Sequence, residues 1–368
     1  MKKIIVYYPY ELRELTSGSA VRPVKMLEGF RKLADEKSLE MIEIYGDSAK
    51  REQLLNDLYK NVNPADILYC YMENATIPMW LTDKDHFPRK PFLDYKFMKF
   101  LKRNNIPLGV FYRDAYWKFN DLYQVKPGIK QVMQQLFRTE LSMFKKYGQV
   151  FYLPSKYMND YVSFPAEKVV PLPPGGMDLL ENKVPAEIPN AIYVGGINPR
   201  YGVYDMLQAF KELNAGEIKI HLHFVCRKEE IAKYQDLIQP FINEKWITIY
   251  HAFGDQLVPI YRKADFGIVP IQRDVYNDFA VAVKLFEYLS YGLPVISTDV
   301  KAQKDLVEDG DFGLVVQSSA ESILTALKKM EDPEVRKYYQ ENAIKALKNK
   351  HLWYNRALTV HNTLSEKK

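Results

Sequence analysis

The chain has 368 residues, 47% of them hydrophobic and 26% charged, which is typical of a globular protein with room for two domains. Its two cysteines, Cys70 and Cys226, lie far apart within apolar runs and predict buried free thiols, which excludes a disulfide framework and a cysteine-rich metal site. The net charge of +5 is uneven, because the stretch from Lys84 to Lys146 carries fourteen lysines and arginines against five aspartates and glutamates. This basic stretch favours an anionic partner. The candidates are an anionic lipid, a phosphate-bearing substrate and nucleic acid.

The chain begins with an apolar run at residues 2–9 that predicts a buried strand. The run is too short for a signal peptide, and charged residues follow it at once. No apolar stretch reaches 18 residues, so we expect no membrane-spanning helix and a cytoplasmic protein. Gly18 stands between this strand and a helix predicted at 20–34, where a glycine either lets the backbone approach a ligand or simply makes the turn.

Strands and helices then alternate, with strands predicted at 39–46 and 65–72 around a polar helix at 48–61. The triplet Asp83-Lys84-Asp85 offers two carboxylates, but it falls in a loop rather than at a strand end, so we expect no metal there. Residues 91–105 mix aromatic side chains with lysines and an arginine. That pattern fits a basic amphipathic helix on an anionic membrane surface, or an ordinary helix that covers a sheet.

A buried strand predicted at 106–114 ends in Arg113-Asp114-Ala115-Tyr116-Trp117. Ligands bind outside the carboxyl ends of strands in doubly wound sheets, so Asp114 is a candidate to contact a substrate hydroxyl, as a base or as a hydrogen-bond partner. Arg113 and Trp117 are candidates to line the same place. The alternative is structural, with Asp114 capping a helix or pairing with Arg113.

The segment that follows is expected to close the first domain. It holds a helix at 127–147, a strand at 149–154 and a helix at 155–163. Five prolines and a glycine pair then fall between 171 and 189, which predicts a linker.

The second half opens with a strand, the glycine pair Gly195-Gly196 and a helix. This arrangement can hold a phosphate, although the G-x-G-x-x-G fingerprint is absent. Strands are also predicted within 218–226, 246–253, 266–271 and 313–316, alternating with helices as in βαβ units.

Residues 280–299, AVAVKLFEYLSYGLPVISTD, predict a helix that is stopped by Gly292 and followed by a buried strand. Lys284 and Glu287 lie three residues apart, so they share one face near the helix N-terminus. A lysine there suits a phosphate, because a helix N-terminus attracts anions, and a carboxylate one turn on suits a pair of ribose hydroxyls. The alternative is an ordinary surface pair.

The motif K-L-F-E-Y-L-x-x-G-x-P-V-I-S-T-D in this segment resembles the nucleotide-sugar signature of GT-B glycosyltransferases, particularly glycosyltransferase family 4. The resemblance implies that Glu287 holds the ribose of the donor and that Lys284 meets its diphosphate. The stretch after Gly195-Gly196 resembles the family's cationic loop in part, and there Arg200 supplies a second cation.

The chain departs from the family at three positions. Gly196 and Tyr201 stand where the family often has cations, and Phe279 stands where the partner glutamate of Glu287 is usual. Asn277 and Asp278, just before Phe279, are expected to orient the donor sugar instead.

The fold class is therefore predicted as α/β of the GT-B type, with two Rossmann-like doubly wound domains facing a central cleft. An acceptor-binding domain is expected at 1–172, a linker at 173–189 and a nucleotide-sugar-binding domain at 190–345. A last helix within 346–368 is expected to cross back to the first domain.

The predicted function is sugar transfer from a nucleotide diphosphate sugar, with UDP as carrier, to a glycan or a polyprenyl-diphosphate-linked acceptor at the inner face of the membrane. Arg200 and Lys284 would neutralise the departing diphosphate, so no metal or other cofactor is expected. Family 4 implies retention of configuration, whereas Asp114 acting as a true base would suit inversion. Two alternatives remain open: a non-catalytic GT-B partner subunit, favoured by Phe279, and a nucleotide-sugar epimerase. Nucleic acid is not expected as a partner, because the basic stretch carries no recognition motif.

Overall fold

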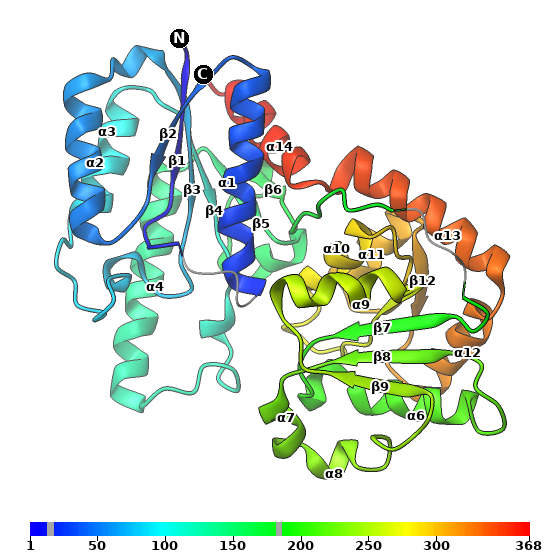
Figure 1. The fold of residues 1–368 in the computed structure, drawn as a ribbon. Helices are drawn as coiled ribbons and strands as arrows, with labels where there is room; N and C mark the ends of the chain where they lie inside the picture. The colour runs from blue at the N-terminus through cyan, green and yellow to red at the C-terminus, as the bar shows by residue number, and fades with distance from the viewer. Residues whose placement is uncertain (13–17, 182–185) are drawn as a thin grey trace. The chain divides into compact units, whose positions relative to one another are not determined.

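The computed structural model describes residues 1–12, 18–181 and 186–368, which form two compact units. Unit 1 comprises Met1–Pro173 and Trp353–Lys368, and unit 2 comprises Pro174–Leu352. Each unit is an open parallel sheet with helices on both faces (Figure 1). The prediction of two doubly wound α/β units is confirmed.

Unit 1 is built on a six-stranded sheet in the order β2-β1-β3-β4-β5-β6, with every pair of neighbours parallel. Its strands are β1 (Lys3–Tyr7), β2 (Glu40–Ile44), β3 (Ile67–Glu73), β4 (Leu108–Phe111), β5 (Val150–Leu153) and β6 (Val169–Pro171). Its helices are α1 (Gly18–Glu36), α2 (Ser48–Asn61), α3 (Leu93–Arg103), α4 (Pro127–Tyr147), α5 (Asn159–Val162) and α14 (Trp353–Ser365). The central strands read as continuous apolar runs because both faces of this sheet are covered.

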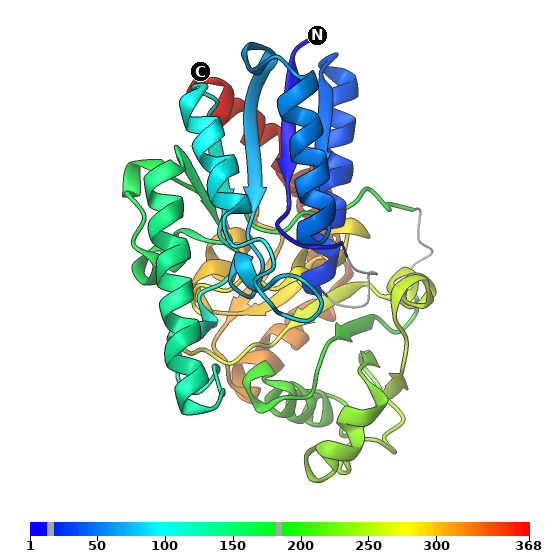
Figure 2. The same ribbon diagram turned by 90° about the vertical axis from the view of Figure 1, so that its left-hand side faces the viewer.

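Different helices pack on the two faces of the unit 1 sheet. On one face, α1 and α14 share a core with Ile4 and Val6 of β1, to which α14 contributes Trp353 and Ala357. On the other face, Phe97 of α3 stacks on Tyr7 of β1 with ring centroids 4.7 Å apart. Figure 2 shows unit 1 from the side on which α2 and α3 lie.

Helix α3 lies within residues 91–105, for which the sequence allowed either a membrane-surface helix or a helix that covers a sheet. Its apolar side chains Phe97, Met98 and Leu101 are buried, whereas its lysines are exposed. The helix thus covers the sheet, and any contact with a membrane would be made by its lysines rather than by an inserted apolar face. None of the helices in the described part of the chain is long and apolar enough to cross a membrane.

Unit 2 repeats the architecture, with the strand order β12-β11-β10-β7-β8-β9 and parallel pairing throughout. Its strands are β7 (Asn190–Val194), β8 (His221–Val225), β9 (Ile247–Tyr250), β10 (Phe266–Val269), β11 (Val295–Thr298) and β12 (Gly313–Val316). Its helices are α6 (Val203–Leu213), α7 (Lys228–Lys233), α8 (Gln235–Ile238), α9 (Val258–Lys263), α10 (Val283–Ser290), α11 (Lys301–Gly310), α12 (Ala320–Met330) and α13 (Pro333–Ala346).

The helix predicted from Ala280 begins three residues later, as α10, because Ala282 still has an extended backbone. The predicted buried face is present, since Leu285, Tyr288 and Leu289 have no exposed surface. Gly292 has φ +68°, the left-handed conformation that ends a helix. The two cysteines are free and buried, as predicted.

Candidate functional site

The first group of candidate residues lies at the carboxyl end of β7, where the chain turns through Gly195-Gly196. Lys284, in the first turn of α10, extends over this turn, so a Cβ atom at Gly195 would overlap its Nζ and would lie 2.9 Å from the Tyr193 hydroxyl. Lys284 Nζ also lies 4.2 Å from the centroid of the Tyr193 ring and 5.8 Å from that of Tyr201. The structure thus brings together two of the residues that the sequence singled out.

Lys284 is a poorly solvated cation. Burial lowers its pKa to about 8, although Glu287 and Glu230 oppose the shift. Within the described part of the chain, no carboxylate makes an ion pair with Nζ. A buried charge that lacks a direct counter-ion is costly, and an anionic ligand would remove that cost.

Glu287 lies one turn further along α10. Its carboxylate accepts a hydrogen bond of 3.1 Å from the hydroxyl of Tyr261. Burial raises the pKa of Glu287, while that hydrogen bond and the charge of Lys284 act in the opposite direction. The carboxylate keeps acceptor capacity for a further pair of hydroxyls.

Arg200 lies in a short 3-10 turn, Pro199–Tyr201, that follows the glycine pair. Its guanidinium forms an ion pair of 2.7 Å with Asp274. The next residue, Tyr201, is the one whose ring approaches Lys284. The turn therefore connects the predicted second cation to the Lys284 site, but the structure holds the Arg200 side chain against the loop at 272–279.

The loop at 272–279 uses its polar side chains internally. The amide of Asn277 donates to the carbonyl of Gln272 at 2.8 Å and to Asp274 at 2.9 Å. Asp278 accepts a 3.2 Å hydrogen bond from the backbone N–H of Lys301, at the start of α11. These contacts shape the loop, so a contact of either side chain with a donor sugar stays a prediction.

Phe279 is 2% exposed and packs edge-on against Tyr276, with ring centroids 5.0 Å apart. Phe279 thus fixes the end of the 272–279 loop by apolar packing. No carboxylate stands at this position to replace the glutamate that the family uses.

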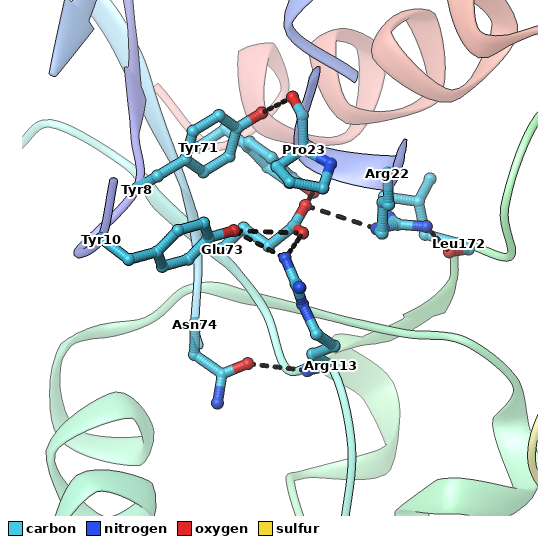
Figure 3. A network of polar contacts seen from close by, with 9 residues as sticks. All are labelled: Tyr8, Tyr10, Arg22, Pro23, Tyr71, Glu73, Asn74, Arg113 and Leu172. Carbon is cyan, nitrogen blue, oxygen red and sulfur yellow. Dashed lines mark hydrogen bonds and ion pairs between the residues drawn. The ribbon is translucent and has the colours of Figure 1, made fainter. Parts of the chain in front are cut away.

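The second group of candidate residues lies in unit 1, at the carboxyl ends of β3 and β4 (Figure 3). Glu73, at the end of β3, is fully buried and accepts from Arg22 at 3.3 Å and from Arg113 at 2.5 Å. Tyr71 and Tyr10 donate to the same carboxylate, at 3.1 and 3.5 Å. Arg113 therefore pairs with Glu73, a residue that the sequence had not marked.

Two other candidate residues of unit 1, Asp114 and Trp117, make contacts that stabilise the fold. Asp114 accepts a 3.0 Å hydrogen bond from the backbone N–H of Tyr116 and so caps the turn that follows β4. Trp117 is 1% exposed, stacks on Phe137 and donates its indole N–H to Tyr112. The burial of Trp117 corrects its predicted contact with a substrate, because the side chain has no surface to offer.

Two further predictions concern the ends of helices. Gly18 is the first residue of α1, and the residues just before it, 13–17, lie outside the described part of the chain. Asp83 accepts 2.7 and 2.5 Å hydrogen bonds from the backbone N–H and the hydroxyl of Ser48, the first residue of α2, whose N-cap is Asp47. Among the described residues, no cluster of histidine, cysteine and acidic side chains is suited to hold a metal ion.

Glu140 of α4 supports the same edge of unit 1 and yields a prediction on stability. It is fully buried and accepts from the Met79 N–H at 2.9 Å and from the Asn74 amide at 3.4 Å. Burial raises its pKa to about 8, against the effect of those hydrogen bonds. The native state thus keeps this proton up to about pH 8, whereas an unfolded chain loses it near pH 4.3.

Stability is therefore expected to fall between pH 5 and pH 8 by up to about 1.4 kcal/mol per pH unit from this group alone. Glu140→Gln should flatten that dependence, and Glu167→Gln, at an exposed position, should not. Urea unfolding of the wild type and of both variants at several pH values measures this pH dependence of the free energy of unfolding. A wild-type stability that is constant from pH 5 to pH 8 would contradict the assignment.

Comparison with known proteins shows which family the second half of the chain resembles. A model described as "Glycosyl transferases group 1" matches residues 188–332, the part of the chain that holds the glycine pair, Lys284 and Glu287. Residues 188–332 are thus similar to the group 1 glycosyl transferases. This confirms the resemblance found in the sequence at the level of the glycosyltransferases.

A relative and several solved structures extend the comparison. The chain is 28% identical over 174 residues to the lipopolysaccharide 1,2-N-acetylglucosaminetransferase of Salmonella typhimurium, and it covers 45% of that protein's length. A glycosyltransferase from Rickettsia africae has a TM-score of 0.63 at 14% identity, with 100% of this chain and 98% of that one covered. HepE of Anabaena, solved in complex with UDP, has a TM-score of 0.65 at 11% identity, with full coverage of both chains. These structural likenesses confirm the GT-B fold.

Sequence reasoning missed one residue of the candidate site within 188–332. Glu230 of α7 accepts a 3.0 Å hydrogen bond from the N–H of Ile197, and a Cβ atom at Gly196 would lie 3.0 Å from both of its carboxylate oxygens. It thus fixes the turn beneath Lys284. In the sequence it lies in a run of charged residues that resembles any solvated helix, and only its place just after the carboxyl end of β8 would have marked it.

Proposed function

We propose that this protein is a glycosyltransferase that moves a sugar from a nucleotide diphosphate sugar to a hydroxyl of a glycan or lipid-linked acceptor in cell-surface polysaccharide biosynthesis. The observation that carries the proposal is Lys284, a half-buried and poorly solvated cation that extends over the Gly195-Gly196 turn with Glu287 one turn beyond it. The Salmonella relative, named as a lipopolysaccharide glycosyltransferase, supports the pathway. UDP is proposed as the carrier because HepE was solved with UDP and with UDP-glucose.

In the proposed reaction, the bond between the sugar and the diphosphate breaks, the oxygen of the acceptor hydroxyl bonds to the sugar, and the hydroxyl proton passes to the departing UDP. Negative charge grows on the diphosphate as that bond breaks, so a cation fixed at this place stabilises the transition state. Lys284 and the free N–H groups of the first turn of α10 supply that stabilisation, and Arg200 adds a second charge. Because protein cations do this work, we propose a metal-independent reaction, with retention of configuration as family 4 implies.

Glu287 is proposed to hold the ribose of the donor. A carboxylate accepts hydrogen bonds from two neighbouring hydroxyls, and the Tyr261 hydroxyl orients it for that task. Unit 1 is proposed to bind the acceptor, with Asp114 beside the acceptor hydroxyl. The exposed lysines of α3 would draw the protein to an anionic membrane surface, a contact that sedimentation with anionic vesicles at two salt concentrations would detect or exclude.

The proposal is tested by incubating the protein with a panel of nucleotide diphosphate sugars and measuring the release of the nucleoside diphosphate. We expect turnover of one UDP-sugar, and a fall in kcat/KM of about 10-fold to 100-fold in Glu287→Gln, since a hydrogen bond to a charged group is lost. Glu321→Gln, at an exposed position in the same unit, is the matched control. Binding of a UDP-sugar without any turnover in the presence of acceptor extracts would favour the non-catalytic partner instead, a possibility to which the buried Phe279 points.

A further inference from the structure

The turn that follows β7 is fixed by three hydrogen bonds. The N–H of Gly195 donates to the last carbonyl of β8 at 3.0 Å. The peptide unit that joins Gly196 to Ile197 is held at both ends. Its carbonyl accepts from the hydroxyl of the fully buried Tyr193 at 2.7 Å, and its N–H donates to the carboxylate of Glu230 at 3.0 Å. The orientation of this peptide unit therefore depends on one hydroxyl and one carboxylate.

Glu230 is half-buried in α7, and its carboxylate lies directly against Gly196. A Cβ atom at Gly196 would lie 3.0 Å from both carboxylate oxygens and 3.1 Å from the Tyr201 ring. These distances are shorter than ordinary van der Waals contacts. Glycine at position 196 thus gives Glu230 the room to reach the N–H of Ile197, and a larger side chain there would displace the carboxylate.

The N–H of Gly196 differs from the other two N–H groups of the turn. It has no hydrogen-bond partner within the described part of the chain, and Gly196 is partly exposed. A backbone N–H that is open to solvent beside a cation suits a phosphate oxygen. Lys284 supplies that cation, because its Nζ lies where a Cβ atom of Gly195 would be.

Glu230 also acts on the charge of Lys284. Burial lowers the pKa of Lys284 to about 8, and the carboxylates of Glu287 and Glu230 raise it against that effect. The remaining neighbours of the amine are the aromatic rings of Tyr193 and Tyr201. Glu287 comes from the same helix as Lys284, so Glu230 is the carboxylate that α7 contributes from across the turn.

We propose that Glu230 is a positioning residue of the donor site: it fixes the turn so that the N–H of Gly196 and the amine of Lys284 meet the diphosphate together, and its negative charge stabilises the cationic amine. Glu230 does not itself contact the diphosphate, because two negative groups repel each other. The inference deepens the proposed function and rests on it for the identity of the ligand as a nucleotide diphosphate sugar.

Calorimetry with the full chain and two probes, inorganic pyrophosphate and UDP, tests the inference. Glu230→Ala should weaken the binding of both probes by about 10-fold at pH 6.5, because the hydrogen bond that orients the turn is lost. Glu230→Gln should bind them within about threefold of wild type at pH 6.5, since its amide oxygen can still accept from Ile197.

The pH dependence separates positioning of the turn from the effect of charge. Without the carboxylate of Glu230, the pKa of Lys284 should be lower, so the amine loses its proton at a lower pH. The affinity of Glu230→Gln for both probes, divided by that of wild type, should therefore fall by about threefold or more between pH 6.5 and pH 8.5. The ratio removes the titration of the probes themselves, which is common to both proteins.

Two further variants are matched to Glu230. Glu229→Gln removes the same charge from an exposed position of the same helix and should stay within about twofold of wild type at every pH. Gly196→Ala should weaken binding because its Cβ displaces the carboxylate, but it should add less than about twofold to the effect of Glu230→Ala. Should Glu230→Ala fail to fold, Glu230→Gln and Gly196→Ala still decide.

The outcomes distinguish this inference from the proposed function. Equal affinities of wild type and Glu230→Ala, or a constant ratio between Glu230→Gln and wild type from pH 6.5 to pH 8.5, would each overturn the inference even if a nucleotide sugar is turned over. Pyrophosphate binding that depends on Glu230, in a protein that turns over no nucleotide sugar, would support the inference and refute the proposed function. A wild-type chain that binds neither probe would overturn both.

Discussion

Replacing Lys284 by methionine is expected to lower kcat/KM for the donor by about 10²-fold to 10³-fold, the usual cost of removing one group that stabilises transition-state charge. Methionine keeps the length and apolar body of the side chain, so the packing over Gly195 and against Tyr193 should survive. Since burial lowers the pKa of Lys284 to about 8, donor binding by the wild-type protein should also weaken as the pH rises through that value.

The Lys284 prediction is measured by steady-state kinetics and by donor binding between pH 6.5 and pH 9.5. Lys328→Met, at an exposed position of α12, is the matched control and should behave as wild type. A Lys284→Met protein with unchanged kcat/KM would remove Lys284 from the mechanism. A wild-type affinity that does not vary across this pH range would show that its amine is not the group that meets the donor.

Replacing Gly202 by alanine is expected to destabilise unit 2 by roughly 3 kcal/mol or more, because a strained backbone and a steric clash add up. Gly202 has φ +64° and joins the turn that carries Arg200 to α6. A Cβ atom there would overlap the carbonyl oxygen of Pro270, which is backbone and cannot move aside as a side chain would. The amides of β7 and α6 should then exchange hydrogen faster, which mass spectrometry detects.

Gly216→Ala is the matched control for Gly202→Ala. No atom lies within 4 Å of the Cβ position at Gly216. Its stability should differ from wild type by less than about 1 kcal/mol. Equal hydrogen exchange in the two variants would mean that the turn at Gly202 can relax at no cost.

The fold could be predicted from the sequence because its signals are local and regular. The apolar run at 2–9 contains β1. The helix predicted to stop at a glycine corresponds to α10, which is followed by Gly292. Such patterns reflect parallel strands that are buried on both faces and helices that bury one face. The start of α10 was placed three residues too early, because nothing in Ala280–Ala282 distinguishes an extended segment from a first helical turn.

The candidate site could be proposed from the sequence only where a motif spans it. Lys284 and Glu287 belong to one continuous signature, and the structure places Lys284 over the predicted glycine pair. Glu73 and Glu230 were missed because their partners are distant in sequence: Glu73 meets Arg22 and Arg113 only once the sheet has formed. Trp117 was misplaced because an aromatic residue near a strand end looks the same in sequence whether it enters the core or lines a pocket.

The most direct test of the account is calorimetric titration of the wild-type chain with UDP and with uridine, in the presence of EDTA. We expect UDP to bind without a metal and uridine to bind far more weakly, because the diphosphate makes the contact with Lys284. UDP binding should fall in Lys284→Met and persist in Lys328→Met. No binding of UDP, or equal binding of UDP and uridine, would contradict the assignment of the Gly195 turn and Lys284 as the diphosphate site.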